Sequence, residues 1–156
     1  MSESLQLLWL RLTRTELEFF EARKAFLEHR GDSVRELDEA LNDPAQRGTA
    51  LRLLRYLPIE ARHVLFPQLV HLASFSHGDV VLVRSLISEL GPEWLQEHLS
   101  TQVRRITSRP DVSYEEYRRL AELLSEVDLG LLQELALQAK SNADPDVREV
   151  GEEYLS

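Results

Sequence analysis

The chain has 156 residues, of which 43% are hydrophobic and 29% charged, a composition that favours one folded domain with a sizeable core over a disordered chain. It contains no cysteine, which excludes disulfides, thiolate metal sites and a cysteine nucleophile. The net charge of −9 lies mostly in the second half of the chain: residues 1–78 hold 11 acidic and 10 basic residues, whereas residues 79–156 hold 16 acidic and 8 basic residues. Because an acidic surface repels phosphate, we expect no nucleic-acid binding.

The first predicted elements are helices over residues 3–12 and 15–29, which weak breaks at Thr13 and Thr15 allow to be one continuous helix. Apolar side chains occur on two sides of this region. Leu5, Leu8, Trp9 and Leu12 share one face, while Leu7 and Leu10 point elsewhere. Such a helix is expected to be buried between layers of its own domain or, as an alternative, against a second copy. A membrane-surface helix fits least, because only Arg11 and Arg14 lie close to the apolar face.

The same region does not have the pattern of a signal peptide. Glu3 stands where positive charge is typical, Arg11 interrupts the apolar run, and no small-residue cleavage site follows. No apolar run approaches the roughly 20 residues of a membrane span. We therefore expect a cytoplasmic protein.

Helix start and stop signals recur along the rest of the chain, and no segment alternates with the period of a strand. Asp-Pro pairs at 43–44 and 144–145 and the Gly91-Pro92 pair mark helix boundaries, and Pro67 is expected to kink or split its helix. Capping boxes are predicted for Thr15 with Glu18, Ser33 with Glu36, and Ser113 with Glu116. The further predicted helices span residues 33–42, 44–56, 59–74, 79–90, 92–107, 113–126, 129–141 and 145–154. The fold class is all-α.

Four of these helices share an internal repeat, in which an arginine is followed by a small or apolar residue and then a large apolar residue at intervals of three. The copies are Arg47, Ala50, Leu53; Arg84, Ile87, Leu90; Arg118, Ala121, Leu124; and Arg148, Gly151, Tyr154. A small middle residue allows a partner helix to approach closely. We expect Arg47 and Arg148 to form ion pairs with Asp43 and Asp144 one turn earlier, a structural role and not a ligand contact.

The segment DPDVREVGEEYL resembles the first helix of a HEAT repeat, and DPAQRGTALRLL, VVLVRSLISELG and YEEYRRLAELL are weaker copies. The resemblance covers residues 43–156, with Ile87 standing where a small residue is usual. It implies a compact, right-handed α-solenoid of antiparallel helix pairs, with residues 1–42 as a helical N-terminal cap of the same single domain. The last helix would close the stack with Glu149, Glu152 and Glu153 facing outward.

No catalytic or cofactor motif accompanies this architecture. Glu60 and His63 have the spacing of half a di-iron site, but no second such pair exists. The chain also lacks a zinc-type histidine pair, a nucleophile elbow and a phosphate-binding glycine loop. We therefore expect neither enzymatic activity nor a bound metal or cofactor.

The HEAT resemblance implies that the second helix of each pair lines a concave, partner-binding surface. On helix 92–107, Leu95, Leu99, Val103 and Ile106 form the expected core stripe. The candidate partner-binding residues are Trp94, His98, Thr101, Gln102, Arg105 and Gln138, with Gln133 a weaker addition. In the alternative interpretation Trp94 covers the core and Arg105 is simply solvated.

The sequence thus predicts a non-catalytic adaptor that binds a protein, with no nucleic-acid or membrane partner, as a monomer or weak homodimer. The alternative is an acidic, immunity-type inhibitor of a basic toxin such as a nuclease. Its candidate residues are Glu115, Glu116, Glu149, Glu152 and Glu153. An enzyme or chromophore-handling protein on a HEAT-like frame is a third, weaker possibility.

Overall fold

The computed structural model describes residues 3–29 and 31–155, and all regular secondary structure in these ranges is helical, as predicted. The helices are α1 (Leu5–Glu28), α2 (Ser33–Asn42), α3 (Arg47–Leu53), α4 (Ile59–Ala73), α5 (Val80–Ser88), α6 (Pro92–Thr107), α7 (Tyr114–Val127), α8 (Leu129–Lys140) and α9 (Pro145–Leu155). Among the described residues, no helix combines the length and apolar character needed to cross a membrane.

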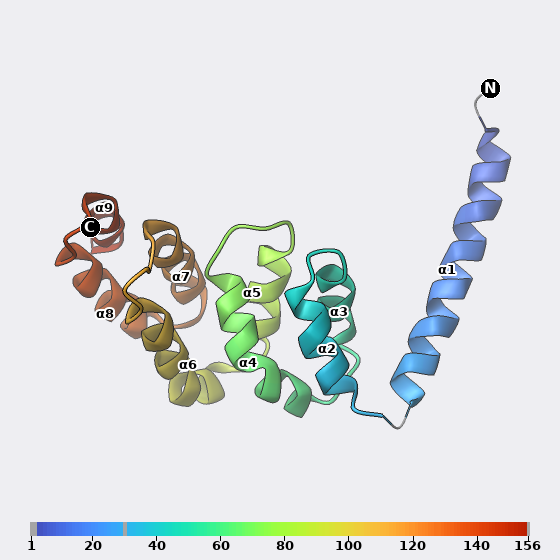
Figure 1. Ribbon diagram of the computed structural model, residues 1–156, viewed down its shortest axis with the longest axis horizontal. Coiled ribbons are helices and arrows are strands. Elements are labelled where there is room, and N and C mark those ends of the chain that lie inside the picture. Colours follow the sequence, from blue (N-terminus) through green and yellow to red (C-terminus); the bar gives the residue numbers. More distant parts are fainter. Residues whose placement is uncertain (1–2, 30, 156) are drawn as a thin grey trace.

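Helices α2 to α9, which we call the body, lie side by side in a row, and α1 stands at one end of it (Figure 1). Helices α2, α4 and α6 contact one another in that order, and α3, α5, α7 and α9 do the same. Consecutive helices also pack together, as α2 does on α3, α4 on α5, α6 on α7 and α8 on α9. The packed body therefore begins at α2.

One continuous core runs through the body from Leu37 in α2 to Val150 in α9. Each body helix contributes one apolar stripe to it, for example the fully buried Leu69 of α4, Leu86 of α5 and Leu99 of α6. Helix α1 differs, because none of its residues is buried. The expectation that the N-terminal helix lies between layers of its own domain is therefore wrong.

The N-terminal region is one continuous helix through Thr13 and Thr15. Thr15 does not cap a helix, since its hydroxyl donates a hydrogen bond to the carbonyl of Arg11 within α1 at 2.9 Å. The cap of α2 is Asp32, which accepts a hydrogen bond from the amide of Arg35, and not Ser33. Asp32 thus caps α2 one residue earlier than expected, because its short polar side chain can accept a hydrogen bond from a free amide at the helix start.

The capping box of Ser113 and Glu116 is confirmed in both of its hydrogen bonds. Pro67, by contrast, does not split its helix, because α4 continues through it from Ile59 to Ala73. The ring of Pro67 is exposed, whereas Phe66 and Leu69 beside it are buried in the core. Packing of this stripe holds the helix together at a residue whose local preference is to break it.

The four repeated arginines all lie on or at the start of the odd-numbered helices α3, α5, α7 and α9. The predicted ion pairs of Arg47 with Asp43 and of Arg148 with Asp144 do not form. Arg47 instead donates to the carbonyl of Leu41 at 3.0 Å, and Arg148 to that of Asn142 at 3.0 Å. Each arginine thus reaches a carbonyl six residues earlier and joins its helix to the end of the preceding one.

The two aspartates are engaged in a different way. Asp43 accepts from the amide of Ala45 at 2.9 Å, and Asp144 from the amide of Asp146 at 2.9 Å. Both carboxylates therefore satisfy free amides at a helix start, which leaves the arginines free to fold back. The first and last copies of the repeat share these contacts.

The two middle arginines link neighbouring odd-numbered helices. Arg84 of α5 pairs with Glu122 of α7 at 2.8 Å, and Arg118 of α7 pairs with Glu153 of α9 at 2.9 Å. Both arginines are largely covered, with side-chain exposures of 14% and 32%. Partly exposed ion pairs contribute little to the free energy of folding, so we expect these two pairs to specify which helices are neighbours more than to stabilise the fold.

Glu89, just after α5, binds two arginines from other elements. Its carboxylate accepts from Arg55 at 2.8 Å and from Arg62 of α4 at 2.9 Å. Desolvation raises the pKa of Glu89, but the hydrogen bond and charge of Arg55, with Ser85 and Arg62, outweigh it and lower the pKa. The side chain of Arg62 is only 11% exposed and depends on this carboxylate.

Helices α8 and α9 pack closely together at Gly151. A Cβ atom added there would lie 2.5 Å from the amide nitrogen of Lys140 and 2.6 Å from the carbonyl oxygen of Ala136. Both are backbone atoms of the helical hairpin and cannot yield like the tip of a side chain. The expectation that a small middle residue of the repeat allows close helix approach is confirmed at this position.

We predict that Gly151→Ala lowers the free energy of unfolding by about 1–3 kcal/mol, because the added methyl forces α8 and α9 apart. Urea denaturation followed by circular dichroism measures the change. The control is Gly78→Ala, where an added Cβ meets no atom within 4 Å. Equal stability of Gly151→Ala and Gly78→Ala would show that the space between α8 and α9 at Gly151 can hold a methyl group, which would contradict this account of the contact.

We also predict that Glu89→Gln lowers the free energy of unfolding by about 1–2 kcal/mol at pH 7, because it leaves Arg62 buried without its counter-charge. Since the folded pKa of Glu89 is lowered, its contribution is complete above its unfolded value of 4.5 and disappears as pH falls through the folded value. The difference from the parent protein should therefore vanish in acid. Glu39→Gln, in an exposed pair with Arg35, should have little effect at any pH.

Candidate functional site

The predicted partner-binding residues lie mainly on α6, which Gly91 and Pro92 begin. Gly91 has a φ of +88°, a left-handed conformation that favours glycine, and Pro92 occupies the first turn. The expected core stripe is confirmed, since Leu95, Leu99 and Val103 are buried, as is Ile106. The register of α6 against α4 is set by this stripe and places the polar residues of both helices along a shared edge.

Trp94 is enclosed by side chains of its own chain. Its ring stacks on His63 at 4.4 Å between centroids and 6° between planes, and on His98 at 4.1 Å and 10°. Phe66 meets the indole edge-on at 4.7 Å. Trp94 is half-buried and packs against the core, as the alternative interpretation expected, so both faces of the indole are already occupied.

His63 therefore has a packing partner. Its ring belongs to the stack on Trp94, while Glu60 one turn earlier is exposed. In the part of the chain that the structure describes, no three histidine or acidic side chains converge in a group suited to a metal ion.

A polar depression that we call the α4/α6 groove lies between these two helices and has a volume of about 260 Å³. Its lining residues are Pro67, Gln68, His71, Gln102, Arg105, Ile106 and Arg109. Of the predicted partner-binding residues, the structure brings Gln102 and Arg105 together here. Gln68 is held by a hydrogen bond from its amide to Asn42 at 2.8 Å, so one wall is fixed.

The ionisable side chains lining this groove are basic, although the protein as a whole carries a net charge of −9. Arg105 is exposed, and no carboxylate of the described residues lies within ion-pair distance of it. Arg109 pairs with Glu116 and, through its buried Nε, with Asp111 at 3.6 Å, which is an ion-pair distance but too long for a hydrogen bond. Arg105 and His71 therefore offer hydrogen-bond donors to an anionic ligand in this groove.

The other predicted residues lie outside this groove. Thr101 is exposed on α6, and Gln133 and Gln138 are exposed on α8. None of them lines the α4/α6 groove. Conversely, sequence reasoning missed Gln68, His71 and Arg109, because their position depends on the register between α4 and α6, for which no local pattern gives a signal.

The five acidic residues do not form one free surface. Glu115 accepts a hydrogen bond from the amide of Ser76 at 3.0 Å, and hydrogen bonding from the side chain of Ser76, together with this amide, lowers the pKa of its carboxyl. Glu116 completes the capping box and binds Arg109, and Glu153 binds Arg118. Glu149 and Glu152 remain exposed on α9.

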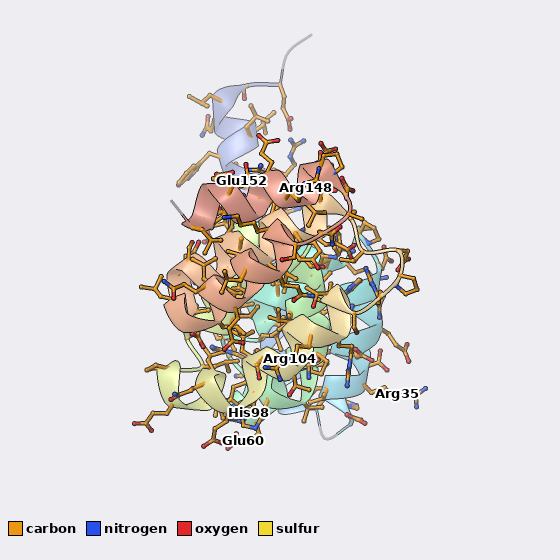
Figure 2. All side chains as sticks on the ribbon, turned by 90° about the vertical axis from the view of Figure 1, so that its left-hand side faces the viewer. Arg35, Glu60, His98, Arg104, Arg148 and Glu152 are labelled. Atoms are coloured by element: carbon orange, nitrogen blue, oxygen red, sulfur yellow. The ribbon has the colours of Figure 1, made fainter. Side chains whose placement is uncertain are left out.

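Figure 2 shows Arg148 and Glu152 of α9 toward the upper part of the body, Glu60 and His98 at its lower end, and Arg104 of α6 between them. Glu152 and His98 therefore lie far apart in this view.

Comparison with known proteins gives no match: no protein-family model, no curated protein and no solved structure is significantly similar to this protein. The resemblance to HEAT repeats remains a prediction from the residues.

We predict that Trp94→Ala lowers the free energy of unfolding by about 2–4 kcal/mol, because it leaves a cavity between Phe66 and the two histidines. The matched control is Leu137→Ala in α8, where the side chain is 58% exposed and stability should change by less than about 0.5 kcal/mol. Denaturant unfolding of both variants measures the difference. Similar small losses would mean that Trp94 is available to a partner and does not hold the core.

Proposed function

We propose that this protein is a non-catalytic, cytoplasmic protein-binding module. In this proposal residues 43–156 form a short HEAT-like α-solenoid, and its even-numbered helices α4, α6 and α8 form the concave face. The occurrence of all four repeated arginines on the odd-numbered helices supports this arrangement. The partner would carry a carboxylate that enters the α4/α6 groove.

The observation that carries this proposal is the exposed guanidinium of Arg105, which has no ion pair among the described residues and lines the α4/α6 groove beside Arg109. A guanidinium presents a planar set of donors that matches a carboxylate in two parallel hydrogen bonds. A glutamate or aspartate side chain, or a terminal carboxylate, would supply such an acceptor for Arg105.

The α4/α6 groove, with a volume of about 260 Å³, has room for a side chain of a partner protein that carries a carboxylate. His98, exposed on the outer face of the Trp94 stack, extends the same surface of α6. An interface formed by an anchored carboxylate and neighbouring aromatic surface is typical of protein recognition.

The alternative, an acidic inhibitor of a basic toxin, would rest mainly on Glu149 and Glu152. The other three carboxylates of that hypothesis are engaged with the protein's own groups. Binding by this face would be lost in Glu149→Gln/Glu152→Gln and would fall steeply with salt.

The test is a pull-down from host lysate with the full-length protein, comparing Arg105→Ala with Arg104→Ala. Arg104 precedes Arg105 on α6 but pairs loosely with Glu134 at 3.7 Å and lies outside the groove. We predict a partner that is retained by the parent protein and by Arg104→Ala and lost with Arg105→Ala. Titration of the purified partner should then show about a tenfold or greater loss of affinity for Arg105→Ala alone.

A partner lost equally with both arginine variants would indicate unspecific attraction to positive charge and would contradict the proposal. A partner lost only with Glu149→Gln/Glu152→Gln would establish the alternative. If no protein binds in a way that depends on Arg105, the α4/α6 groove is not a docking site.

A further inference from the structure

Helix α1 exposes more apolar surface than any other part of the described structure. All nine of its large apolar side chains up to Phe20 are between 38% and 82% exposed: Leu5, Leu7, Leu8, Trp9, Leu10, Leu12, Leu17, Phe19 and Phe20. On the body, exposed large apolar residues occur singly, for example Val81 and Leu137. An apolar surface of this extent on one element marks an interaction site.

Only the C-terminal end of α1 touches the body. Arg23 donates to the hydroxyl of Tyr56 at 3.0 Å and lies over its ring at 4.4 Å from the centroid. Phe26 packs against the edge of the core. The rest of the helix extends away from α2 and α3 (Figure 1).

The stripe that meets the body continues without a partner toward the N-terminus. Leu5, Leu12 and Phe19 repeat every seven residues up to Phe26, so they lie on the same side of the helix. Leu7 and Leu10 lie on the far side, so a covering element on one side alone would leave them exposed.

The charges of α1 are arranged with opposite signs at its two ends. Glu3, Arg11 and Arg14 give residues 3–14 a net charge of +1. The charged residues that follow, up to residue 28, give a net charge of −2; they are Glu16, Glu18, Glu21, Arg23, Lys24 and Glu28. Two copies of this helix attract each other when antiparallel, because each basic half then faces an acidic half.

We propose that α1 pairs antiparallel with α1 of a second copy of this protein, in a symmetric dimer. The N-terminal half of each helix lies between α1 of the other copy and the end of the other body formed by α2 and α3. That end has a cavity of about 350 Å³ beside Phe26, with Leu37, Ala40, Ala50 and Leu53 among its lining. This arrangement covers both apolar sides of residues 5–12, which a simple pair of helices would not do.

The available surface is sufficient for a stable dimer. Leucines, phenylalanines and a tryptophan exposed to this degree amount to on the order of 700 Å² per copy, close to the roughly 800 Å² per partner of a standard interface. A twofold axis makes both contacts identical, so each residue contributes twice.

Sedimentation equilibrium of the full-length protein tests the proposal. Leu12→Glu should raise the dimer dissociation constant at least about tenfold, whereas Leu137→Glu on α8, with the same 58% exposure, should leave it unchanged. Leu10→Glu should also weaken the dimer, because Leu10 faces the other body. None of these side chains is buried in the monomer, so the fold is retained in every variant.

The direction of pairing is tested by cross-linking, since the protein has no natural cysteine. In the antiparallel dimer Thr15→Cys lies near the twofold axis and should cross-link with a short bismaleimide. Gln6→Cys should not, because nine residues on each side of the centre separate the two positions by about 27 Å along the helices.

A monomer at all accessible concentrations would overturn the proposal, as would a dimer that Leu12→Glu leaves intact or one in which Gln6→Cys cross-links efficiently. Co-sedimentation of a monomeric protein with anionic lipid vesicles, abolished by Leu12→Glu, would assign α1 to a membrane surface instead. The dimer is independent of the α4/α6 groove, so Arg105→Ala should leave its dissociation constant unchanged.

Discussion

Every helix of the body depends on burying one apolar stripe between its neighbours. Helices of this length are marginal when isolated in water, so their stability comes from packing. The shortest, α3, has seven residues and buries Ala50, Leu51 and Leu53 among them. Helix α1 meets the same requirement only at Phe26, where it touches the core. The body therefore buries its apolar stripes within one chain, whereas in our proposal the apolar surface of α1 is buried only by contact with a second copy.

The same packing positions the two surfaces that we propose for binding. Burial of Leu69 and Leu99 fixes α4 against α6 and so places Arg105 beside Arg109 in the α4/α6 groove. The groove presents the guanidinium of Arg105 to an anionic group, while α1 presents apolar side chains on two sides. One surface therefore selects by charge and the other by apolar contact. A dimer through α1 would present two grooves to a partner and strengthen its binding through avidity.

Much of the fold could be predicted from the sequence because its signals are local. Helix period, proline, glycine and capping residues indicated the helices, with the bounds of α2 and α6 correct to the residue. Errors arose where tertiary contacts override local preference, as at Pro67, which packing keeps helical, and at Arg47, which binds a carbonyl in place of Asp43. Only part of the α4/α6 groove could be predicted. Arg105 belongs to a polar stripe that can be recognised in the sequence of α6, whereas His71 reaches the groove only through the register of α4 against α6.

Our main proposal is that a second copy of the protein covers the apolar surface of α1. The most direct test is amide hydrogen exchange of residues 5–22, measured at protein concentrations below and above the range in which the dimer forms. Our account predicts exchange near the rate of an isolated, fraying helix at low concentration, and strong protection of these amides at high concentration. Amides in the core of α4 should be protected at both. Equally fast exchange in α1 at both concentrations would contradict the account, because the exposed stripe would then have no partner in a second copy.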